Sequence, residues 1–338
     1  MEQNPAKIKL GRVIAQYRGK YRVSSENEEF WAEVIGKIIY TAETQLNFPV
    51  VGDLVNIIDI GHGNAVIKDI LPRKSIFERK AAGKDSAQPI AANVDTAFIV
   101  EAVDQDFNLN RFERYMVIIL NAKIEPVLIL NKIDLIPPTE LKEKITLIKD
   151  RFGDTPLLST SIFSENGIDD LKQSIKDGRI YCFLGSSGVG KSSLINKLLG
   201  QELIKTKEIS LQTKKGQHTT THRELFVLNN GGMVIDNPGM REVGMANAVE
   251  GVKSVFYEIE RLGKACRFAD CTHQHEPGCA VLEAVQTGAL SKEKYGNYNK
   301  LKKEAAHYAM TSAEKKEKDR SLGRVIKDYH KMFDKKGK

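Results

Sequence analysis

"GSSGVGKSS", at residues 185–193, lies between the apolar run "RIYCFL" and the helix-forming run "KSSLINKLLG". It matches the pattern G-x-x-x-x-G-K-S/T, in which a glycine-rich turn joins a β-strand to an α-helix. The small residues let backbone N–H groups approach phosphate oxygens, and the positive end of the helix dipole favours their negative charge. The sequence therefore predicts a nucleotide-binding loop on an α/β sheet.

Two side chains of this loop carry the expected chemistry. Lys191 is expected to neutralise charge on the β- and γ-phosphates and to support catalysis, and the Ser192 hydroxyl is expected to bind Mg²⁺. The predicted phosphate-binding residues are Gly185, Ser186, Ser187, Gly188, Val189, Gly190, Lys191, Ser192 and Ser193. A glycine-rich turn without a ligand is the alternative, and the flanking strand and helix count against it.

"NKID", at residues 131–134, follows the apolar run "PVLIL", so it lies where ligands bind a parallel sheet. The Asp134 carboxylate can accept hydrogen bonds from N1–H and the 2-amino group of guanine, whereas adenine offers no matching donors. Asn131 is expected to position the loop, the Lys132 stem to cover the base, and Ile133 to complete the motif. Further along, "TSIFSENG" resembles a second guanine-contact loop with Ser161 at its key position; an ordinary strand-to-helix loop is the alternative.

"DNPG", at residues 236–239, follows the apolar run "GGMVI". Asp236 is expected to hold Mg²⁺ through water, and the Gly239 N–H to contact the γ-phosphate. An ordinary Asn-Pro-Gly turn is the alternative, which the phosphate-binding loop upstream disfavours.

The segment "GQHTTTH" lies between these two motifs and supplies the remaining candidates. Thr219, Thr220 or Thr221 could give Mg²⁺ a second hydroxyl, and we expect Thr220 to do so. Met240 occupies the place of the water-orienting glutamine in Ras-like enzymes, so His218 is the candidate that positions the attacking water. A role for His218 in shaping the loop alone is the alternative.

"CRFADCTHQHEPGC", at residues 266–279, contains three of the four cysteines. Three thiolates and one imidazole make a closed, structural zinc site, for which the predicted ligands are Cys266, Cys271, His273 and Cys279. His275 is the rival histidine, and a small core without metal is a further alternative. Cys182, within an apolar run, is expected to be buried.

Composition sets broad limits on the rest of the chain. No apolar run is long enough to span a bilayer and the N-terminus lacks a secretory signal, so we expect a cytoplasmic protein without a membrane partner. Residues 291–338 carry fifteen Lys/Arg against seven Asp/Glu, whereas the whole chain has a net charge of +7. This local surplus favours contact with a nucleic-acid backbone over a merely solvated helical face.

The pattern of apolar runs predicts several domains. Residues 1–72 alternate apolar and polar residues between turn signals and suggest an OB-like β-barrel, which could bind nucleic acid or serve only for protein docking. Residues 73–92 look like a linker. Strands alternate with helices over residues 93–250, which predicts a parallel α/β sheet, and residues 251–338 read as helices around the cysteine-rich segment.

The order NKID, TSIFSENG, GSSGVGKSS, GQHTTTH, DNPG and CRFADCTHQHEPGC resembles the ribosome small-subunit-dependent GTPase A family. The resemblance covers nearly the whole chain and implies an OB domain, a circularly permuted P-loop GTPase domain and a mostly helical zinc domain. It departs from the usual D-T-P-G at Asn237. It further implies GTP and GDP as ligands, Mg²⁺ and one structural Zn²⁺ as cofactors, and the small (30S) ribosomal subunit with its 16S rRNA as partner.

The resemblance therefore implies a GTPase that acts as a late checkpoint in small-subunit maturation, with hydrolysis stimulated by the subunit. A monomer is our separate expectation, and the sequence itself does not determine the oligomeric state. Two other functions remain open from the residues alone. An RNA- or subunit-binding assembly chaperone could use its GTP site only to stabilise the fold. A permuted ATPase would need adenine to be accepted in spite of Asp134.

Overall fold

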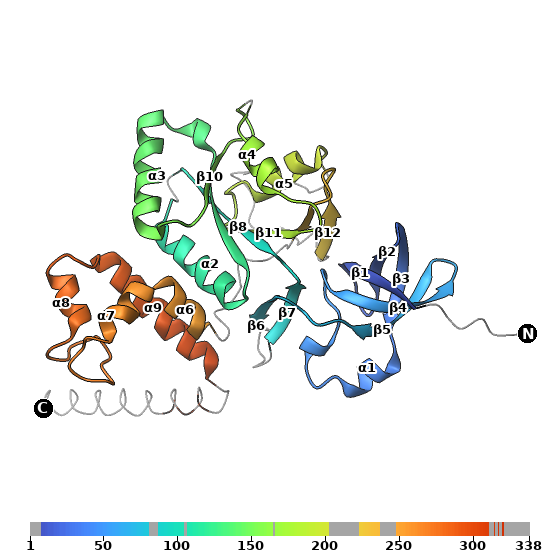
Figure 1. Cartoon of the computed structure of the whole chain (residues 1–338), viewed down its shortest axis with the longest axis horizontal. Coiled ribbons are helices and arrows are strands. Elements are labelled where there is room, and N and C mark those ends of the chain that lie inside the picture. The colour runs from blue at the N-terminus through green and yellow to red at the C-terminus, as the bar shows by residue number, and fades with distance from the viewer. Residues whose placement is uncertain are drawn as a thin grey trace, which may run out of the picture.

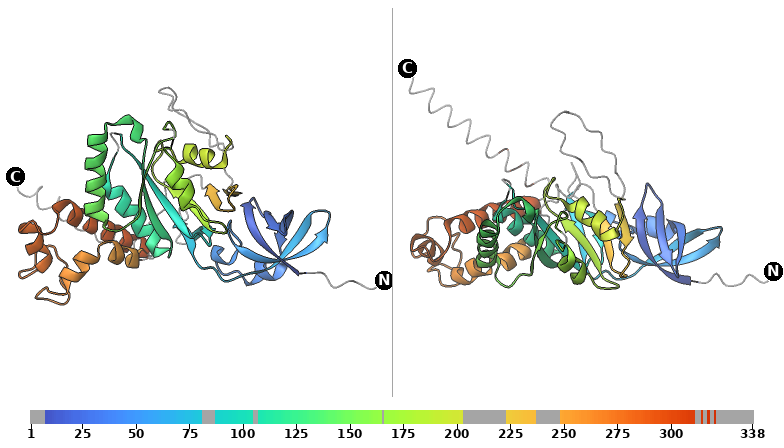
Figure 2. Two further views of the ribbon diagram at one scale, coloured as in Figure 1. Left: turned by 45° about the horizontal axis from the view of Figure 1, so that its top comes forward. Right: turned by 90° about the horizontal axis from the view of Figure 1, so that it is seen from above.

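The computed structural model describes residues 8–80, 87–104, 107–164, 166–202, 223–236 and 248–310, together with positions 314, 317 and 320. Three parts follow one another along the long axis of the molecule: a β-barrel, a central sheet with helices on both faces, and a group of helices (Figures 1 and 2). Within the described residues, no helix combines the length and the apolar character that crossing a membrane requires.

The barrel contains five strands, joined in the order β1-β2-β3-β5-β4 and closed by pairing of β1 with β4. Its strands are β1 (Ile8–Gln16), β2 (Tyr21–Ser25), β3 (Glu28–Val34), β4 (Leu54–Gly61) and β5 (Asn64–Ile70). Alternate side chains point inward, and Val23, Ile57 and Ile67 are fully buried there. A short helix, α1 (Gly36–Thr41), lies between β3 and β4. The expected OB-like barrel is confirmed.

The segment expected to be a linker contains a β-hairpin. β6 (Ile76–Lys80) pairs antiparallel with β7 (Ala87–Ala92), and the apolar Phe77 and Ile90 of these strands are buried in the core of the central sheet. Arg73 fixes the entry to this hairpin, since its guanidinium donates two hydrogen bonds of 2.7 Å to the buried Asp53 carboxylate. The described parts of this segment, residues 73–80 and 87–92, therefore connect the barrel and the sheet through paired strands.

The central sheet has the strand order β10-β9-β8-β11-β13-β12. Its strands are β8 (Thr96–Ala102), β9 (Glu125–Asn131), β10 (Leu157–Thr160), β11 (Ile180–Leu184), β12 (Arg223–Val227) and β13 (Met233–Asp236). The expected parallel α/β sheet is present, and β12 is an antiparallel strand at its edge that the sequence pattern did not reveal. A tight turn around Gly231 joins β12 to β13, and strands joined by so short a turn must run antiparallel.

β12 also joins the sheet to the barrel. Ala15 and Gln16 of β1 pair antiparallel with Glu224 and Arg223 of β12. The strands of the barrel and of the central sheet therefore form one hydrogen-bonded series of eleven strands.

Helices cover both faces of the central sheet (Figure 1). α2 (Leu109–Asn121) and α3 (Pro138–Phe152) pack on one face, and α4 (Asp169–Ser174) and α5 (Lys191–Leu199) pack on the other. The turn after α4 enters β11 through Gly178, which has a φ of +70° and donates its N–H to the Gly231 carbonyl. This short joint places the phosphate-binding loop downstream of the NKID loop in the sequence.

Four helices of the described residues lie near the C-terminus. They are α6 (Val249–Val255), α7 (Tyr257–Gly263), α8 (Ala280–Gln286) and α9 (Lys292–Ala309). Two of them, α6 and α9, pack against α2. One continuous apolar core runs from the sheet through α2 into these helices, with Phe112, Phe256 and Tyr298 among its buried members. The C-terminal helices are therefore docked on α2, and their removal would expose its apolar face.

Gly251 marks the closest contact between α6 and α2. A Cβ atom at Gly251 would lie 2.0 Å from the Val117 carbonyl oxygen, so only glycine fits there. We predict that Gly251→Ala lowers the free energy of unfolding by about 1–3 kcal/mol, because the helices must move apart. Urea denaturation followed by circular dichroism measures the change.

Gly296→Ala is the matched control, because Gly296 lies within α9 with no atom near its missing Cβ. Alanine should raise stability there by roughly 0.5–1 kcal/mol through helix propensity. Similar effects of the two substitutions would contradict the tight contact at Gly251.

Candidate functional site

The phosphate-binding loop runs from the end of β11 to the start of α5. Gly185, Gly188 and Gly190 have φ values of +143°, +84° and +97°, which side chains rarely adopt. At Gly185 a Cβ would also lie 2.2 Å from the Val100 carbonyl oxygen, so the loop must pass close to β8. The predicted strand, loop and helix are confirmed, and Ser192 and Ser193 lie in the first turn of α5.

Lys191 folds back over this loop. Its ammonium group donates hydrogen bonds of 2.8 and 2.6 Å to the carbonyl oxygens of Gly185 and Ser186. These contacts hold a positive charge over the loop and beside the N-terminus of α5, where the helix dipole adds further positive potential. The arrangement is suited to the binding of an anion such as a phosphate group.

Asn131 connects the NKID loop to the phosphate-binding loop. Its side chain is 2 % exposed and donates a 2.7 Å hydrogen bond to the Val189 carbonyl oxygen. The side-chain carbonyl oxygen of Asn131 accepts a 2.8 Å hydrogen bond from the Thr160 hydroxyl. A Cβ at Gly190 would lie 2.4 Å from the Asn131 amide nitrogen, so this contact also requires glycine. The amide therefore holds together three loops that are far apart in the sequence.

Asp134 and Ser161 also meet, as their assignment to one site requires. The Ser161 hydroxyl donates a 2.5 Å hydrogen bond to an Asp134 carboxylate oxygen, and the Ser161 N–H donates to the Gly167 carbonyl oxygen. Ser161 is buried, whereas Asp134 is exposed at the edge of the sheet. Ser161 thus orients the carboxylate of a residue that is exposed to solvent.

Lys132 reaches across the same edge. Its backbone is left-handed, with a φ of +62°, and its ammonium group donates a 3.1 Å hydrogen bond to Asp104. Asp104, Thr160 and Gly167 were not identified from the sequence. Asp, Thr and Gly are common in loops, so their presence alone does not mark them as hydrogen-bond partners of the site. Only the neighbouring motifs indicated the region in which such partners could lie.

Asp236, at the end of β13, lies close to the charge of Lys191. Burial raises the pKa of Asp236, the positive charge of Lys191 lowers it, and the nearby Glu224 raises it. A carboxylate in such surroundings gains from a further cation. Asp236 and the Ser192 hydroxyl supply the hard oxygen donors that Mg²⁺ prefers. The predicted Thr219, Thr220, Thr221, His218 and Gly239 lie outside the described residues.

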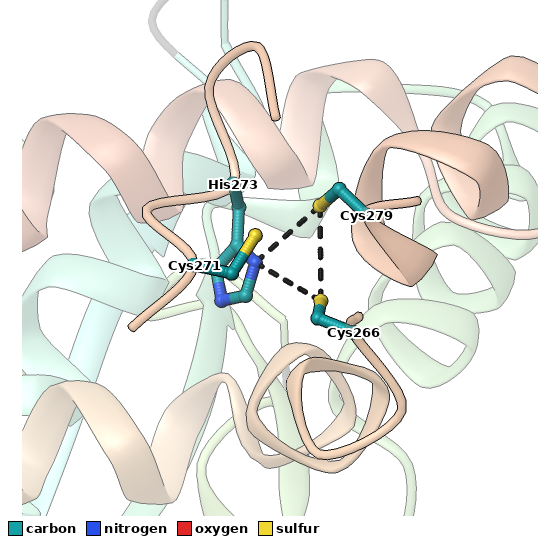
Figure 3. Close-up of side chains that lie close together, drawn as sticks. All are labelled: Cys266, Cys271, His273 and Cys279. Atoms are coloured by element: carbon teal, nitrogen blue, oxygen red, sulfur yellow. Dashed lines mark hydrogen bonds between the residues drawn. The ribbon is translucent and has the colours of Figure 1, made fainter. Parts of the chain in front are cut away.

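The four predicted metal ligands come together at a second site, between α7 and α8 (Figure 3). The Sγ atoms of Cys266 and Cys279 are 3.8 Å apart, and each lies 3.5 Å from Nδ1 of His273. A tetrahedral zinc ion with Zn–S bonds of about 2.3 Å and a Zn–N bond of about 2.0 Å separates such atoms by about 3.8 and 3.5 Å. With Cys271, all four donor atoms lie within 4.8 Å of one another. The donor set and its spacing fit a tetrahedral zinc ion.

The surroundings favour His273 over its rival. Burial lowers the pKa of His273, which maintains the neutral imidazole that a metal requires. Its carbonyl oxygen accepts a hydrogen bond from the Tyr295 hydroxyl of α9. His275 is exposed, and its N–H donates to the Glu276 carboxylate. Burial raises the pKa of the separate Cys182 thiol to about 12, in keeping with a structural role.

Comparisons with known proteins agree with this geometry. The family model described as RsgA GTPase matches residues 70–246, and a model described as 50S ribosome-binding GTPase matches residues 180–319. A relative from Bacteroides thetaiotaomicron, named small ribosomal subunit biogenesis GTPase RsgA 1, is 40 % identical over 95 % of this chain and 90 % of its own length.

Two solved structures resemble the fold. YjeQ from Thermotoga maritima is 28 % identical, with a TM-score of 0.65 over 89 % of this chain and 99 % of that chain. YloQ, described as a circularly permuted GTPase, is 22 % identical, with the same TM-score over 92 % of this chain and 100 % of that chain; this likeness shows the fold.

The spacing of the four metal ligands predicts that Cys271→Ala removes zinc from the protein. Because the energy of metal binding contributes directly to folding, the variant should lose about 3 kcal/mol or more of stability in the C-terminal helices. Zinc content by atomic absorption and thermal unfolding by calorimetry measure both effects. Cys182→Ala is the control and should retain its zinc. A Cys271→Ala protein with full zinc content would contradict the assignment.

Proposed function

Because the chain belongs to the RsgA GTPase family and is a GTP hydrolase, we propose that it binds the small ribosomal subunit and acts as a late checkpoint in its maturation. The subunit stimulates hydrolysis of GTP to GDP and phosphate in this proposal. Support for the partner comes from the curated relatives, which are named small ribosomal subunit biogenesis GTPases. The chain covers 90 % of the length of the Bacteroides relative.

The observation that carries the proposal is the hydrogen bond from Asn131 to Val189. It joins the loop proposed to read guanine to the loop proposed to hold phosphates, so one nucleotide can contact both. Asp134, oriented by Ser161, would accept hydrogen bonds from N1–H and the 2-amino group of guanine. Residues 185–193 would surround the phosphates, with Lys191 as the neutralising cation.

We propose Mg²⁺ as a cofactor held by Ser192 and Asp236, with Thr220 as the third protein donor. When bound, Mg²⁺ neutralises phosphate charge as the bond to the γ-phosphate breaks. The Gly239 N–H would contact the γ-phosphate, and His218 remains our proposal for the residue that positions the attacking water.

We also propose one structural zinc ion at Cys266, Cys271, His273 and Cys279, and a monomeric protein that contacts 16S rRNA. The local excess of basic residues in 291–338 supports a phosphate-backbone contact by α9 and the segment after it. The division into a barrel (1–72), a linker (73–92), a GTPase domain (93–250) and a zinc domain (251–338) is likewise a proposal. The core shared by α2 and the C-terminal helices implies that the last two would not fold independently.

A coupling between nucleotide and subunit would pass through α2. On the nucleotide side, the Tyr115 side chain lies close to Ser186 of the phosphate-binding loop. On the opposite side, Arg114 donates hydrogen bonds of 2.5 and 2.6 Å to the Glu304 carboxylate of α9. A change in the phosphate-binding loop could therefore shift the C-terminal helices. Nucleotide binding would then change the affinity for the subunit, and subunit binding would change the affinity for the nucleotide by the same factor.

Asp134→Asn tests the guanine assignment and the enzyme activity together. The amide would keep an oxygen toward Ser161 and turn its NH₂ group toward the base, so the 2-amino group of guanine would face a donor. GTP turnover should fall by roughly 100-fold or more at subsaturating GTP. Xanthosine triphosphate carries a carbonyl in place of the 2-amino group, so the variant should hydrolyse it better than it hydrolyses GTP. Phosphate release, with and without small subunits, measures the rates.

Wild-type protein should be stimulated by small subunits, and the remote, exposed Asp150→Asn should behave like wild type. Absence of stimulation, with subunit binding indifferent to nucleotide, would favour the assembly chaperone. Equal turnover of ATP and GTP by the wild type would favour the ATPase.

Arg114→Gln and Glu304→Gln test the coupling through α2. Each removes one partner of a single bidentate ion pair, so each should lower subunit-stimulated turnover by about five- to tenfold while basal turnover stays unchanged. The double variant should lose no more than the single variants, because all three lack the same interaction. Stimulated phosphate release measures this effect.

Lys253→Gln is the control, since its ion pair with Glu250 lies within α6. Wild-type stimulation of all the Arg114 and Glu304 variants would exclude this pair from the coupling.

A further inference from the structure

Phe163 is a large apolar side chain at the edge where the guanine base is proposed to bind. It lies in the loop between β10 and α4, and it is 81 % exposed. Ile162, immediately before it, packs partly into the core beneath α4 and α5. The loop therefore buries one of two consecutive apolar residues and leaves the other in solvent.

The loop that carries Phe163 is held close to Asp134. The Phe163 N–H donates a 3.1 Å hydrogen bond to the Ser161 hydroxyl, and the same hydroxyl donates to the Asp134 carboxylate. A single oxygen atom thus connects the backbone of Phe163 to the carboxylate that faces the base. Next to Asp134 in the sequence, Leu135 is 59 % exposed, and the nearby Lys132 stem extends toward Asp104. Apolar groups therefore flank this exposed carboxylate.

Hydrogen bonds to Asp134 give selectivity but limited affinity, because they replace hydrogen bonds to water. A purine base also has two apolar faces, and aromatic stacking on such a face is favourable for any base. A guanine whose edge meets Asp134 has its faces within reach of side chains from the Ser161 loop. The exposed ring two residues beyond Ser161 is the aromatic group in the described part of this loop.

We propose that Phe163 stacks on the guanine base that Asp134 selects, and so contributes affinity for guanine nucleotides without contributing to the choice of base. This inference rests on the proposed GTPase function and adds an affinity-determining residue to its site. A role of the exposed ring in docking to the ribosomal subunit is the alternative outcome of the experiment.

Calorimetric titration of the full-length protein with GDP and with inosine diphosphate tests the proposal. Phe163→Ala should weaken binding of both nucleotides by about tenfold, within the range known for loss of a base–aromatic stack. The ratio of the two affinities should stay unchanged, because both bases offer the same kind of face. Phe163→Tyr should bind like wild type, and Tyr40→Ala, an exposed aromatic on α1 of the barrel, should have no effect.

A second measurement reports contact directly. The chain has one tryptophan, Trp31, which lies on the barrel, so wild-type emission should not respond to GDP. In a protein that combines Trp31→Phe with Phe163→Trp, saturating GDP should quench the introduced tryptophan by stacking.

The two ways of failing are distinct. If wild type binds GDP but Phe163→Ala binds it equally well and GDP leaves the emission of the introduced tryptophan unchanged, the stacking proposal is wrong while the GTPase assignment stands. A Phe163→Ala protein with normal GDP affinity and reduced stimulation would assign the ring to subunit docking. If wild type does not bind GDP at all, the proposed function itself fails.

Discussion

The buried amide of Asn131 is the interaction on which the arrangement of the site depends. It accepts a hydrogen bond from Thr160 and donates one to Val189, so it joins the ends of β9 and β10 to the loop after β11. Parallel strands bring these ends to one edge of the sheet, but the sheet alone does not fix how the loops at that edge lie relative to one another. Because the amide is buried, replacing it by an apolar group would leave polar partners unsatisfied.

This dependence explains why the order of the motifs along the chain can be permuted. The loops need only meet at one edge, and the short turn at Gly178 connects α4 to β11 without disturbing that edge. α2 lies between the sheet and the C-terminal helices and buries side chains toward both. α2 is therefore shared by two parts of the molecule that the sequence separates.

The sequence predicted the features that depend on local spacing. These include the barrel, the strand, loop and helix around residues 185–193, and the meeting of Cys266, Cys271, His273 and Cys279, whereas the guanine-reading and phosphate-binding roles stay predictions. It did not predict the reversal of β12, the hairpin within 73–92 or the docking of α9 on α2, since each depends on pairings between distant residues. Asp104 and Thr160 were missed for the same reason. The predicted threonine loop and Gly239 lie outside the described residues.

The pairing of β1 with β12 has a consequence for solubility. β12 is the last strand of the central sheet, and an uncovered last strand offers backbone groups to which another chain can add. The barrel covers the start of this edge through Ala15 and Gln16, while the opposite edge strand, β10, has only four residues. A protein shortened to the central sheet would expose a longer template for intermolecular β-pairing. The barrel thus also protects its neighbour against aggregation.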